Sequence, residues 1–356
     1  MLPQSEYAVA VNDARVKRFV AEAYEYARCF GIARMGFFPE FSMEMTQKWA
    51  RWLAEHRVKR EQPLDRGPAG AYPQASETCA VADMINLAVR LSETGIGDYW
   101  DDVDQYVRNH LVESQLLRRD LLEEIIAAAP KHEIDPEVET NENVLERNIG
   151  TFASLSDPAW LYAWWTMCCP GNASCALYDA WRSIIQHGDG VAQVNLLLNR
   201  ASPWIDLDSY LPYQGKVVLK NKTAQKAYVR IPLWADKKAV RCQVNQRDVS
   251  PHWLNNYLII EGLAARDVVV IEFPMVESTA KYTLPSYRQQ YTCHFKGNTL
   301  VEISPRGGRP ALAQMASDDG SRFEINNGYP IYMRDHYKQN EAPLRRAQRY
   351  ISPTLI

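Results

Sequence analysis

The sequence predicts a multidomain α and β fold, in which a helical domain is followed by a β-sandwich domain. Apolar residues recur at helical spacing from Ala14 to His187. After the turn at 188–190 the period falls towards two, and turn residues separate the segments. A chain of 356 residues has room for about two domains. We therefore expect a helical domain at 1–188, a β-sandwich domain at 189–305 and an irregular C-terminal extension at 306–356.

Two adjacent helices stand out in the first half. Apolar positions at helical spacing predict helices over 81–91 and over 99–111. Between them, Gly95 can end the first helix and Asp98 can cap the second, which predicts an antiparallel helical hairpin. The second helix opens with an acidic cluster, which we expect to face solvent in the first helical turn, where the helix dipole favours carboxylates: Asp101, Asp102 and Asp104.

The second half contains short segments typical of strands. Those at 216–219, 227–232 and 268–273 are rich in β-branched and aromatic residues, with turn residues between them. Asp206 and Asp208 alternate along another such segment, so they should share one exposed face of a strand.

Composition places the chain among ordinary globular proteins. It is 46% hydrophobic and 23% charged, with a formal net charge of −3, which does not indicate a nucleic-acid partner. The start lacks a basic segment followed by an apolar one, and no later segment offers about 18 uninterrupted apolar residues. From this we expect a cytoplasmic protein with no membrane partner.

The cysteines predict reduced thiols and a metal site rather than disulfides. Their number is odd, and the chain is too long to need a disulfide framework. The seven are Cys29, Cys79, Cys168, Cys169, Cys175, Cys242 and Cys293.

Two short motifs offer three thiolates and one carboxylate to a single metal ion. The first is Glu-Thr-Cys at 77–79, which opens a helical run, and the second is Cys-Cys-Pro-Gly-Asn at 168–172. Zinc accepts a mixed sulfur and oxygen set in tetrahedral geometry. Such a site would be either a reaction centre or a structural metal clip.

Each motif also has a purely structural interpretation. A glutamate at 77 suits the first turn of a helix beside a small buried thiol, and adjacent cysteines can be two core residues. Pro170, however, suits an early helical position, so the cysteine pair lies at a helix entry. A helix N-terminus stabilises a thiolate, which favours a chemical role.

Together these motifs resemble glycoside hydrolase family 127, the β-L-arabinofuranosidase type. The resemblance runs from about Glu77 to Phe273, and the two cysteine motifs are its most specific part. Three further segments fit the same pattern: Val-Asn-Leu at 194–196, Arg-Ile-Pro-Leu-Trp-Ala at 230–235 and Ile-Glu-Phe-Pro-Met at 271–275. The resemblance implies an α/α barrel followed by a β-sandwich.

The resemblance also implies a zinc ion and a set of roles. Its ligands would be Glu77, Cys79, Cys168 and Cys169, and Cys168 would be the nucleophile of a retaining glycosidase. The acid/base would be Glu61, which lies 16 residues before Glu77. The alternative for Glu61 is a solvated glutamate at the end of a charged helix, because its neighbours differ from the family's usual pattern.

The α/α barrel should be incomplete in this chain. About sixty residues precede Glu61, and 187 residues supply about six to eight helices, whereas six helical hairpins need about twelve. The exposed inner faces of an incomplete barrel would favour association, so we expect that a homodimer could close it.

Two functions from different classes follow. The first is a zinc-dependent retaining glycoside hydrolase acting on β-L-arabinofuranosides or related sugars. The second is a catalytically inactive relative, in which a structural zinc supports a carbohydrate-binding or interaction module, because closed four-ligand zinc sites are usually structural. Neither interpretation identifies the substrate-binding residues.

Overall fold

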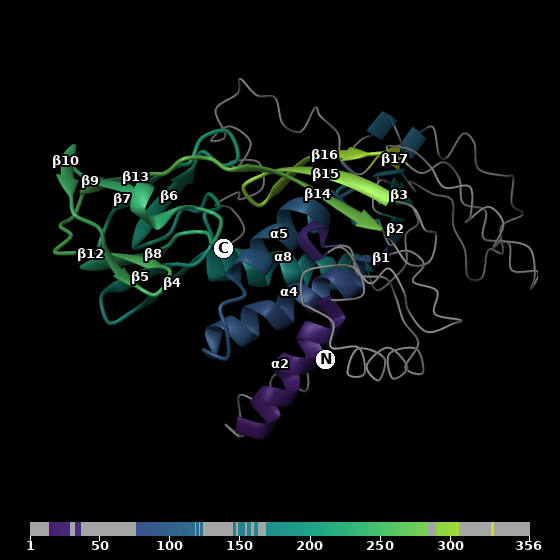
Figure 1. Ribbon diagram of the computed structural model, residues 1–356, viewed down its shortest axis with the longest axis horizontal. Coiled ribbons are helices and arrows are strands. Elements are labelled where there is room, and N and C mark those ends of the chain that lie inside the picture. The colour runs from purple at the N-terminus through teal and green to yellow at the C-terminus, as the bar shows by residue number, and fades with distance from the viewer. Residues whose placement is uncertain are drawn as a thin grey trace, which may run out of the picture.

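The computed structural model describes the helical core, the strands that follow it and several shorter segments. The residues described are 14–28, 33–36, 76–117, 119–120, 122–123, 145–146, 149–153, 155–157, 160–162, 169–283, 290–305 and 329–330. Within them, helices dominate before Ile185 and strands dominate after it (Figure 1). The fold is therefore a mixture of helices and several β-sheets, as predicted.

The helices pack side by side at the centre of the molecule. They are α2 (Ala14–Arg28), α4 (Thr78–Glu93), α5 (Trp100–Tyr106) and α8 (Cys169–Ile184), with the short helical segments η1 (Ala33–Met35) and η2 (Val107–Leu111). A third short segment, η3 (Lys237–Ala239), lies between strands of the second half of the chain. The predicted helices at 81–91 and 99–111 are thus found in α4 and in α5 continued by η2. Gly95 follows α4 with a φ of +68°, a left-handed conformation that glycine adopts without a steric penalty. None of the helices described has the length and apolar character needed to cross a membrane.

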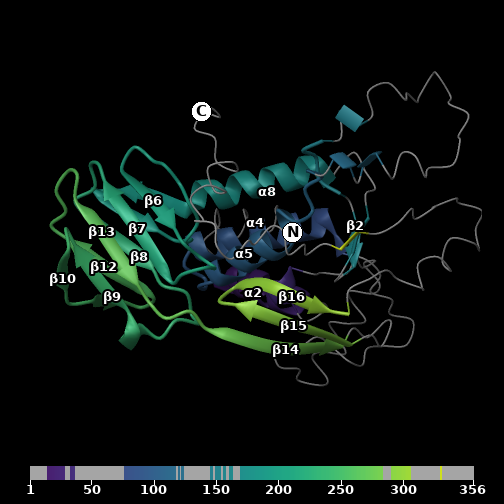
Figure 2. The same cartoon turned by 90° about the horizontal axis from the view of Figure 1, so that it is seen from above.

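Two five-stranded sheets form a sandwich at one end of the molecule (Figures 1 and 2). One has the order β10-β9-β13-β7-β6 and the other the order β11-β12-β8-β5-β4. Only the β5–β8 pair is parallel among the described pairs of these sheets. The strands of the first sheet are β6 (Ile205–Ser209), β7 (Lys216–Asn221), β9 (Arg241–Val244), β10 (Arg247–Val249) and β13 (Val268–Glu272). Those of the second are β4 (Ile185–Gly188), β5 (Val191–Val194), β8 (Lys226–Arg230), β11 (His252–Leu254) and β12 (Tyr257–Glu261).

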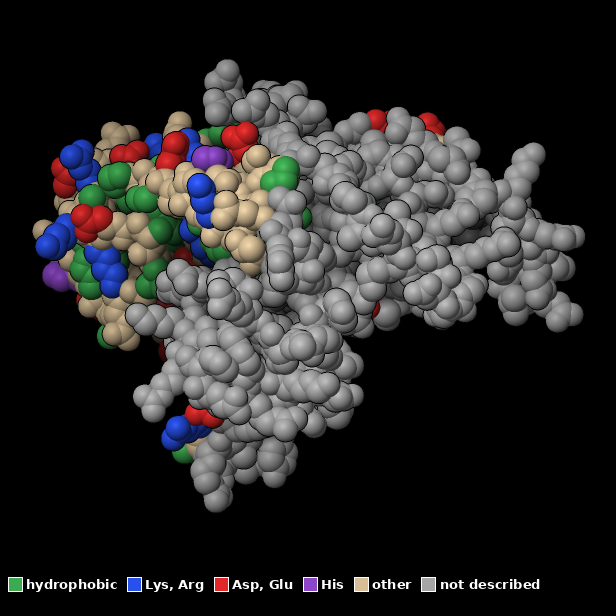
Figure 3. Space-filling model, turned by 45° about the vertical axis from the view of Figure 1, so that its right-hand side comes forward, with side chains coloured by type: hydrophobic (Ala, Val, Ile, Leu, Met, Phe, Trp, Pro, Cys, Tyr) green, Lys and Arg blue, Asp and Glu red, His purple; other side chains and the backbone are tan. Residues whose placement is uncertain are grey.

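Alternating side chains of both sheets fill the core between them. Val217 and Leu219 of β7 and Val229 of β8 are fully buried, while their neighbours on each strand are more exposed. Asp206 and Asp208 share the less buried face of β6, as predicted, and they pair with Lys222 and Lys220. In Figure 3, acidic and basic side chains intermingle over the visible face of the sandwich. The buried side chains continue without a break from the sandwich into α4 and α5.

Two smaller sheets lie against the helical part. Strands β14 (Glu277–Thr283), β15 (Gln290–Lys296) and β16 (Thr299–Ser304) form an antiparallel sheet of their own, beyond the sandwich and alongside the helices (Figure 2). The other sheet has the order β1-β2-β3-β17, from β1 (Ser76–Glu77), β2 (Leu155–Asp157), β3 (Trp160–Tyr162) and β17 (Tyr329–Pro330). Strand β1 leads directly into α4, so this sheet fixes the start of that helix.

The acidic cluster of α5 is buried, which contradicts the prediction that it faces solvent. Asp101, Asp102 and Asp104 are each 6% or 7% exposed. Burial of a carboxylate is tolerated when a cation is paired with it, and each of the three has its own arginine. The pairs are Arg230–Asp101 at 2.5 Å, Arg28–Asp102 at 3.0 Å and Arg108–Asp104 at 2.6 Å.

These pairs tie α5 to three other parts of the chain. Arg230 ends β8 of the sandwich, and Arg28 ends α2. Asn298, in the turn between β15 and β16, donates its amide to both Asp101 and Asp104, at 2.8 and 2.9 Å. Its neighbour Gly297 has a φ of +59°, and a Cβ there would lie 2.6 Å from the Trp234 ring. Helix α5 is therefore the hub that orients the sandwich and the β14–β16 sheet relative to α2.

Candidate metal centre

The first half of the site forms where β1 becomes α4. Glu77 is the last residue of β1, and Cys79 is the second residue of α4. The junction is fixed by Thr78, whose buried hydroxyl donates a 2.6 Å hydrogen bond to the carbonyl of Ala153. Pairing of β1 with β2 holds Glu77 opposite Leu155. Glu77 and Cys79 are both half-buried, so each can present its side chain to the same point.

The second half is the start of α8. Cys169 is the first residue of this helix and Pro170 the second, as the sequence predicted for a helix entry. Cys169 is fully buried. The N-termini of α4 and α8 thus lie close together. Unpaired backbone N–H groups at helix N-termini favour negative charge on nearby groups. That environment stabilises a thiolate over a thiol.

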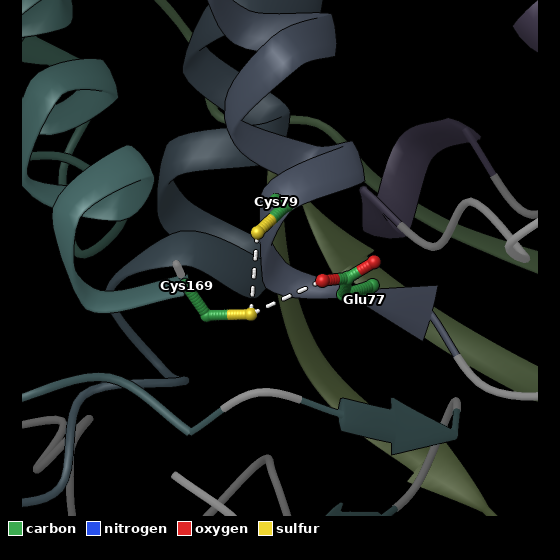
Figure 4. A group of neighbouring side chains, drawn as sticks. All are labelled: Glu77, Cys79 and Cys169. Carbon is green, nitrogen blue, oxygen red and sulfur yellow. Dashed lines mark hydrogen bonds between the residues drawn. The ribbon is translucent and has the colours of Figure 1, made fainter. Parts of the chain in front are cut away.

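Glu77, Cys79 and Cys169 form a compact cluster (Figure 4). The Cys79 Sγ donates to the Cys169 Sγ at 3.2 Å, and the Cys169 Sγ donates to Glu77 Oε1 at 3.3 Å. All three ligand atoms lie within 4.8 Å of one another, and neither cysteine is in a disulfide. This group could hold a metal ion.

The donor set fits zinc with a small adjustment. Two thiolates and a carboxylate are typical zinc ligands. Zinc–sulfur bonds of about 2.3 Å in a tetrahedron place two sulfur atoms about 3.8 Å apart. The observed separation is 3.2 Å, so zinc binding requires the sulfur atoms of Cys79 and Cys169 to separate by a little over half an ångström. Rotation about the cysteine χ1 bonds can supply a shift of that size.

A further carboxylate lies near the cluster on α4. Asp83 is half-buried, and burial raises the pKa of its carboxyl group, with a further increase from the negative charge of Glu77. Neither Asp83 nor Asn86, one turn later, was predicted as a site residue from the sequence. The sequence did contain an indication of these residues, because positions 79, 83 and 86 are polar and recur at helical spacing in an otherwise apolar segment.

The structure brings together three of the five residues that the resemblance placed in the site. Glu77, Cys79 and Cys169 converge as described above. Cys168 directly precedes Cys169 but lies outside the described residues, and so does Glu61. Their roles remain predictions.

Comparison by sequence finds no relative. No known family profile matches the chain, and no curated protein matches it.

Comparison by structure finds glycoside hydrolases of family 127. The chain is similar to the GH127 β-arabinofuranosidase BT3674, with a TM-score of 0.55 and 16% identity, over 83% of this chain and 45% of that one. A GH127 β-L-arabinofuranosidase from Geobacillus stearothermophilus T6 matches with a TM-score of 0.44 and 16% identity, over 80% and 46% of the two chains. A further glycoside hydrolase structure matches with a TM-score of 0.44 and 14% identity, over 67% of this chain and 38% of that one. The match to BT3674 indicates a GH127-like fold. The chain spans less than half the length of each of these proteins.

Proposed function

We propose that the chain is a zinc-dependent retaining glycoside hydrolase that acts on β-L-arabinofuranosides or related sugars. The observation that carries the proposal is the convergence of Glu77, Cys79 and Cys169 at two helix N-termini, directly beside Cys168 in the sequence. The GH127-like fold supports it, because the similar structure BT3674 is a β-arabinofuranosidase.

The proposed zinc ligands are Glu77, Cys79, Cys168 and Cys169. Bound zinc would lower the pKa of its cysteine ligands, so that a thiolate exists at neutral pH. The fully buried position of Cys169 suits a ligand that only holds the metal. Cys168 would then supply the thiolate that attacks the sugar.

In the proposed reaction, the Cys168 sulfur attacks the anomeric carbon and forms a C–S bond as the glycosidic C–O bond breaks. Glu61 donates a proton to the departing oxygen. In the second half, Glu61 takes a proton from water, the water oxygen bonds to the anomeric carbon, and the C–S bond breaks to return the thiolate. Two inversions give net retention of configuration.

Variants at the two proposed catalytic residues test this mechanism. Cys168→Ser should abolish hydrolysis of every arabinofuranoside, because the serine hydroxyl is a far weaker nucleophile at neutral pH. Glu61→Gln should slow hydrolysis of an alkyl β-L-arabinofuranoside by about 10²–10⁴-fold, but an aryl one much less, because a phenolate departs without a proton. Cys175→Ser is the matched control, since Cys175 is exposed on α8.

Three results would contradict the mechanism. If Cys168→Ser keeps full turnover, Cys168 is not the nucleophile. If Glu61→Gln hydrolyses the alkyl substrate as fast as the unaltered protein does, Glu61 is not the acid/base. If NMR during hydrolysis shows that the first sugar product has inverted configuration at its anomeric carbon, the double-displacement mechanism is contradicted.

A further inference from the structure

Strand β14 is the longest strand at the edge of a sheet in the part of the chain that the structure describes. It spans seven residues, whereas the edge strands of the sandwich, β4, β6, β10 and β11, span three to five. Among the described strands it pairs only with β15, in a register that runs without a shift from Glu277 to Thr283. Figure 2 shows β14 on the outer side of its sheet. An edge of this length and regularity is a template for pairing with another strand.

The free edge of β14 presents the backbone groups of alternate residues. The Val276 carbonyl accepts a 2.8 Å hydrogen bond from the Gly297 N–H, so it points towards β15. In an antiparallel sheet the N–H and C=O groups of one residue point to the same side, and successive residues alternate. The even-numbered positions of β14 therefore face β15, and the odd-numbered positions turn their backbone groups to the free edge. The odd-numbered positions are Glu277, Thr279, Lys281 and Thr283.

The side chains at this edge are exposed and carry both signs of charge. Glu277, Thr279 and Lys281 are exposed, whereas Tyr282 on the opposite face is buried. The Glu277 side chain is 77% exposed, and its contact with Lys296 is a long one of 3.6 Å. Lys281 makes no ion pair with the described residues. The edge thus offers an acid and a base, four residues apart, to a partner strand.

The charge pattern of β14 is complementary to itself in one antiparallel register. A two-fold axis at Thr279 sets Glu277 of each copy opposite Lys281 of the other copy. An axis at 277 or 281 sets like charges opposite each other, and an axis at 278 or 280 sets both charges opposite uncharged residues. An axis between two residues would set backbone groups that face the free edge opposite groups that face β15. Charge and backbone direction therefore select the axis at Thr279.

We propose that β14 joins two copies of this chain in a symmetric dimer, in which the two strands pair antiparallel about Thr279. The pair 279 with 279 and the two pairs 277 with 281 would each exchange two backbone hydrogen bonds. Val276, which is 42% exposed, comes opposite Tyr282 of the second copy on the inner face. A single strand pair is a small interface, so the dissociation constant should lie between about 1 µM and 1 mM. The dimer requires neither zinc nor glycosidase activity.

Sedimentation velocity over a range of protein concentrations measures the dissociation constant. Glu277→Lys and Lys281→Glu each set two like-charged pairs in the interface, so each should raise the dissociation constant at least about tenfold. Lys238→Glu is the matched control, because Lys238 is exposed on η3 and its substitution changes the net charge as Lys281→Glu does. The control should dimerise as the unaltered protein does. All three positions are exposed, so none of the variants should lower the unfolding temperature appreciably.

Mixing the two single variants tests the register itself. In an equimolar mixture of Glu277→Lys and Lys281→Glu, both lysines of one chain lie opposite both glutamates of the other. The mixture should therefore form a heterodimer about as tightly as the unaltered protein forms its dimer, although neither variant dimerises well alone. The double variant Glu277→Lys/Lys281→Glu should dimerise again by the same argument. Recovery of this kind cannot come from a variant that has simply unfolded.

Hydrogen exchange locates the interface along the strand. As the concentration rises through the dissociation constant, exchange of the Thr279 and Lys281 amides should slow, whereas the Ala280 amide, already bonded to β15, should not change. A protein that stays monomeric up to about 1 mM would overturn the proposal. So would a dimer whose dissociation constant is the same in both single variants, because its interface would lie elsewhere. Loss of the dimer in both single variants without recovery in their mixture would overturn the register about Thr279.

Discussion

Cys79 and Cys169 place their Sγ atoms 3.2 Å apart, although 90 positions separate them in the sequence. Each belongs to the first turn of a helix, so the contact joins the N-termini of α4 and α8. Glu77, which precedes α4, completes a cluster of two sulfur atoms and one carboxylate. Predictions about metal binding and thiol chemistry follow from this one contact.

Removal of any one cluster ligand should weaken zinc binding. Glu77→Gln, Cys79→Ser and Cys169→Ser each replace an anionic ligand by a neutral group, and the expected loss of affinity is at least about 10²-fold, since even partners outside the ligand shell cost 10–100-fold. Competition with a chromogenic chelator measures the affinity. Cys175→Ser should retain it, because Cys175 lies on the exposed face of α8. Equal zinc affinity in all four variants would contradict the assigned ligands.

Without metal, Cys79 and Cys169 should form a disulfide when treated with hydrogen peroxide. One thiolate attacks peroxide to give a sulfenic acid and water or hydroxide, and the second thiol then displaces the remaining oxygen as water to form the S–S bond. The sulfur atoms are already in contact, so the second step needs little rearrangement. Peptide mapping by mass spectrometry should find this crosslink in chelator-treated protein and little of it in zinc-loaded protein. Oxidation of Cys175 in preference to the pair would count against the contact.

Loss of Arg230 should strongly destabilise the fold. The Arg230 side chain is buried and pairs with Asp101 at 2.5 Å and with Asp98 at 2.8 Å. Arg230→Leu leaves the buried Asp101 carboxylate without its cation, which typically costs about 3–5 kcal/mol. Urea unfolding should show this loss, whereas Lys226→Ala, which breaks the exposed and solvent-screened pair with Glu261, should leave the unfolding free energy almost unchanged. A loss below about 1 kcal/mol for Arg230→Leu would mean that α5 does not depend on this pair.

His110 should make the fold sensitive to acid. Its side chain is fully buried, and burial lowers the pKa of the imidazole from 6.5 to about 4, although a hydrogen bond with the Gly36 backbone acts in the opposite direction. The unfolded chain therefore binds more protons than the folded one between pH 6.5 and 4, so stability is lost as the pH falls through that window. Between pH 7 and 5 the loss from this residue is about 2 kcal/mol.

The comparison that isolates His110 is between the unaltered protein and His110→Gln, measured by urea unfolding at both pH values. Burial raises the pKa of Asp102 to about 6, so Asp102 titrates with the opposite sign in an overlapping window, and both proteins contain it. The unaltered protein should lose about 2 kcal/mol more than His110→Gln between pH 7 and 5. An equal loss in both proteins would contradict the assigned role of His110.

Helix α4 and strand β6 were predictable from periodicity, because their burial follows it. The apolar repeat of α4 and the alternation of β6 both appear in the structure where the sequence indicated them. The burial of Asp101 was not predictable from local sequence, because its partner Arg230 lies 129 residues away and only the tertiary fold brings them together. The general preference of carboxylates for a solvated first helical turn gave the wrong expectation there.

Some residues of the candidate site were likewise predictable from the sequence, and others were not. Glu77, Cys79 and Cys169 were singled out because motif resemblance carries long-range information that periodicity lacks. Asp83 and Asn86 share no motif with them, and only the in-register packing of α4 on α8 shows that buried alanines of α8 face them. Spacing along α4 could have indicated that they share a face with Cys79, but not which described residues of α8 lie opposite them.

Zinc content and turnover, measured on one preparation of the purified protein, test the central claim most directly. We expect about one zinc ion per chain. Hydrolysis of an aryl β-L-arabinofuranoside should stop on chelation and return when zinc is added back. Bound zinc without turnover would contradict the glycosidase and favour a structural metal in a binding module. A protein that neither contains zinc nor takes it up would contradict the metal centre itself.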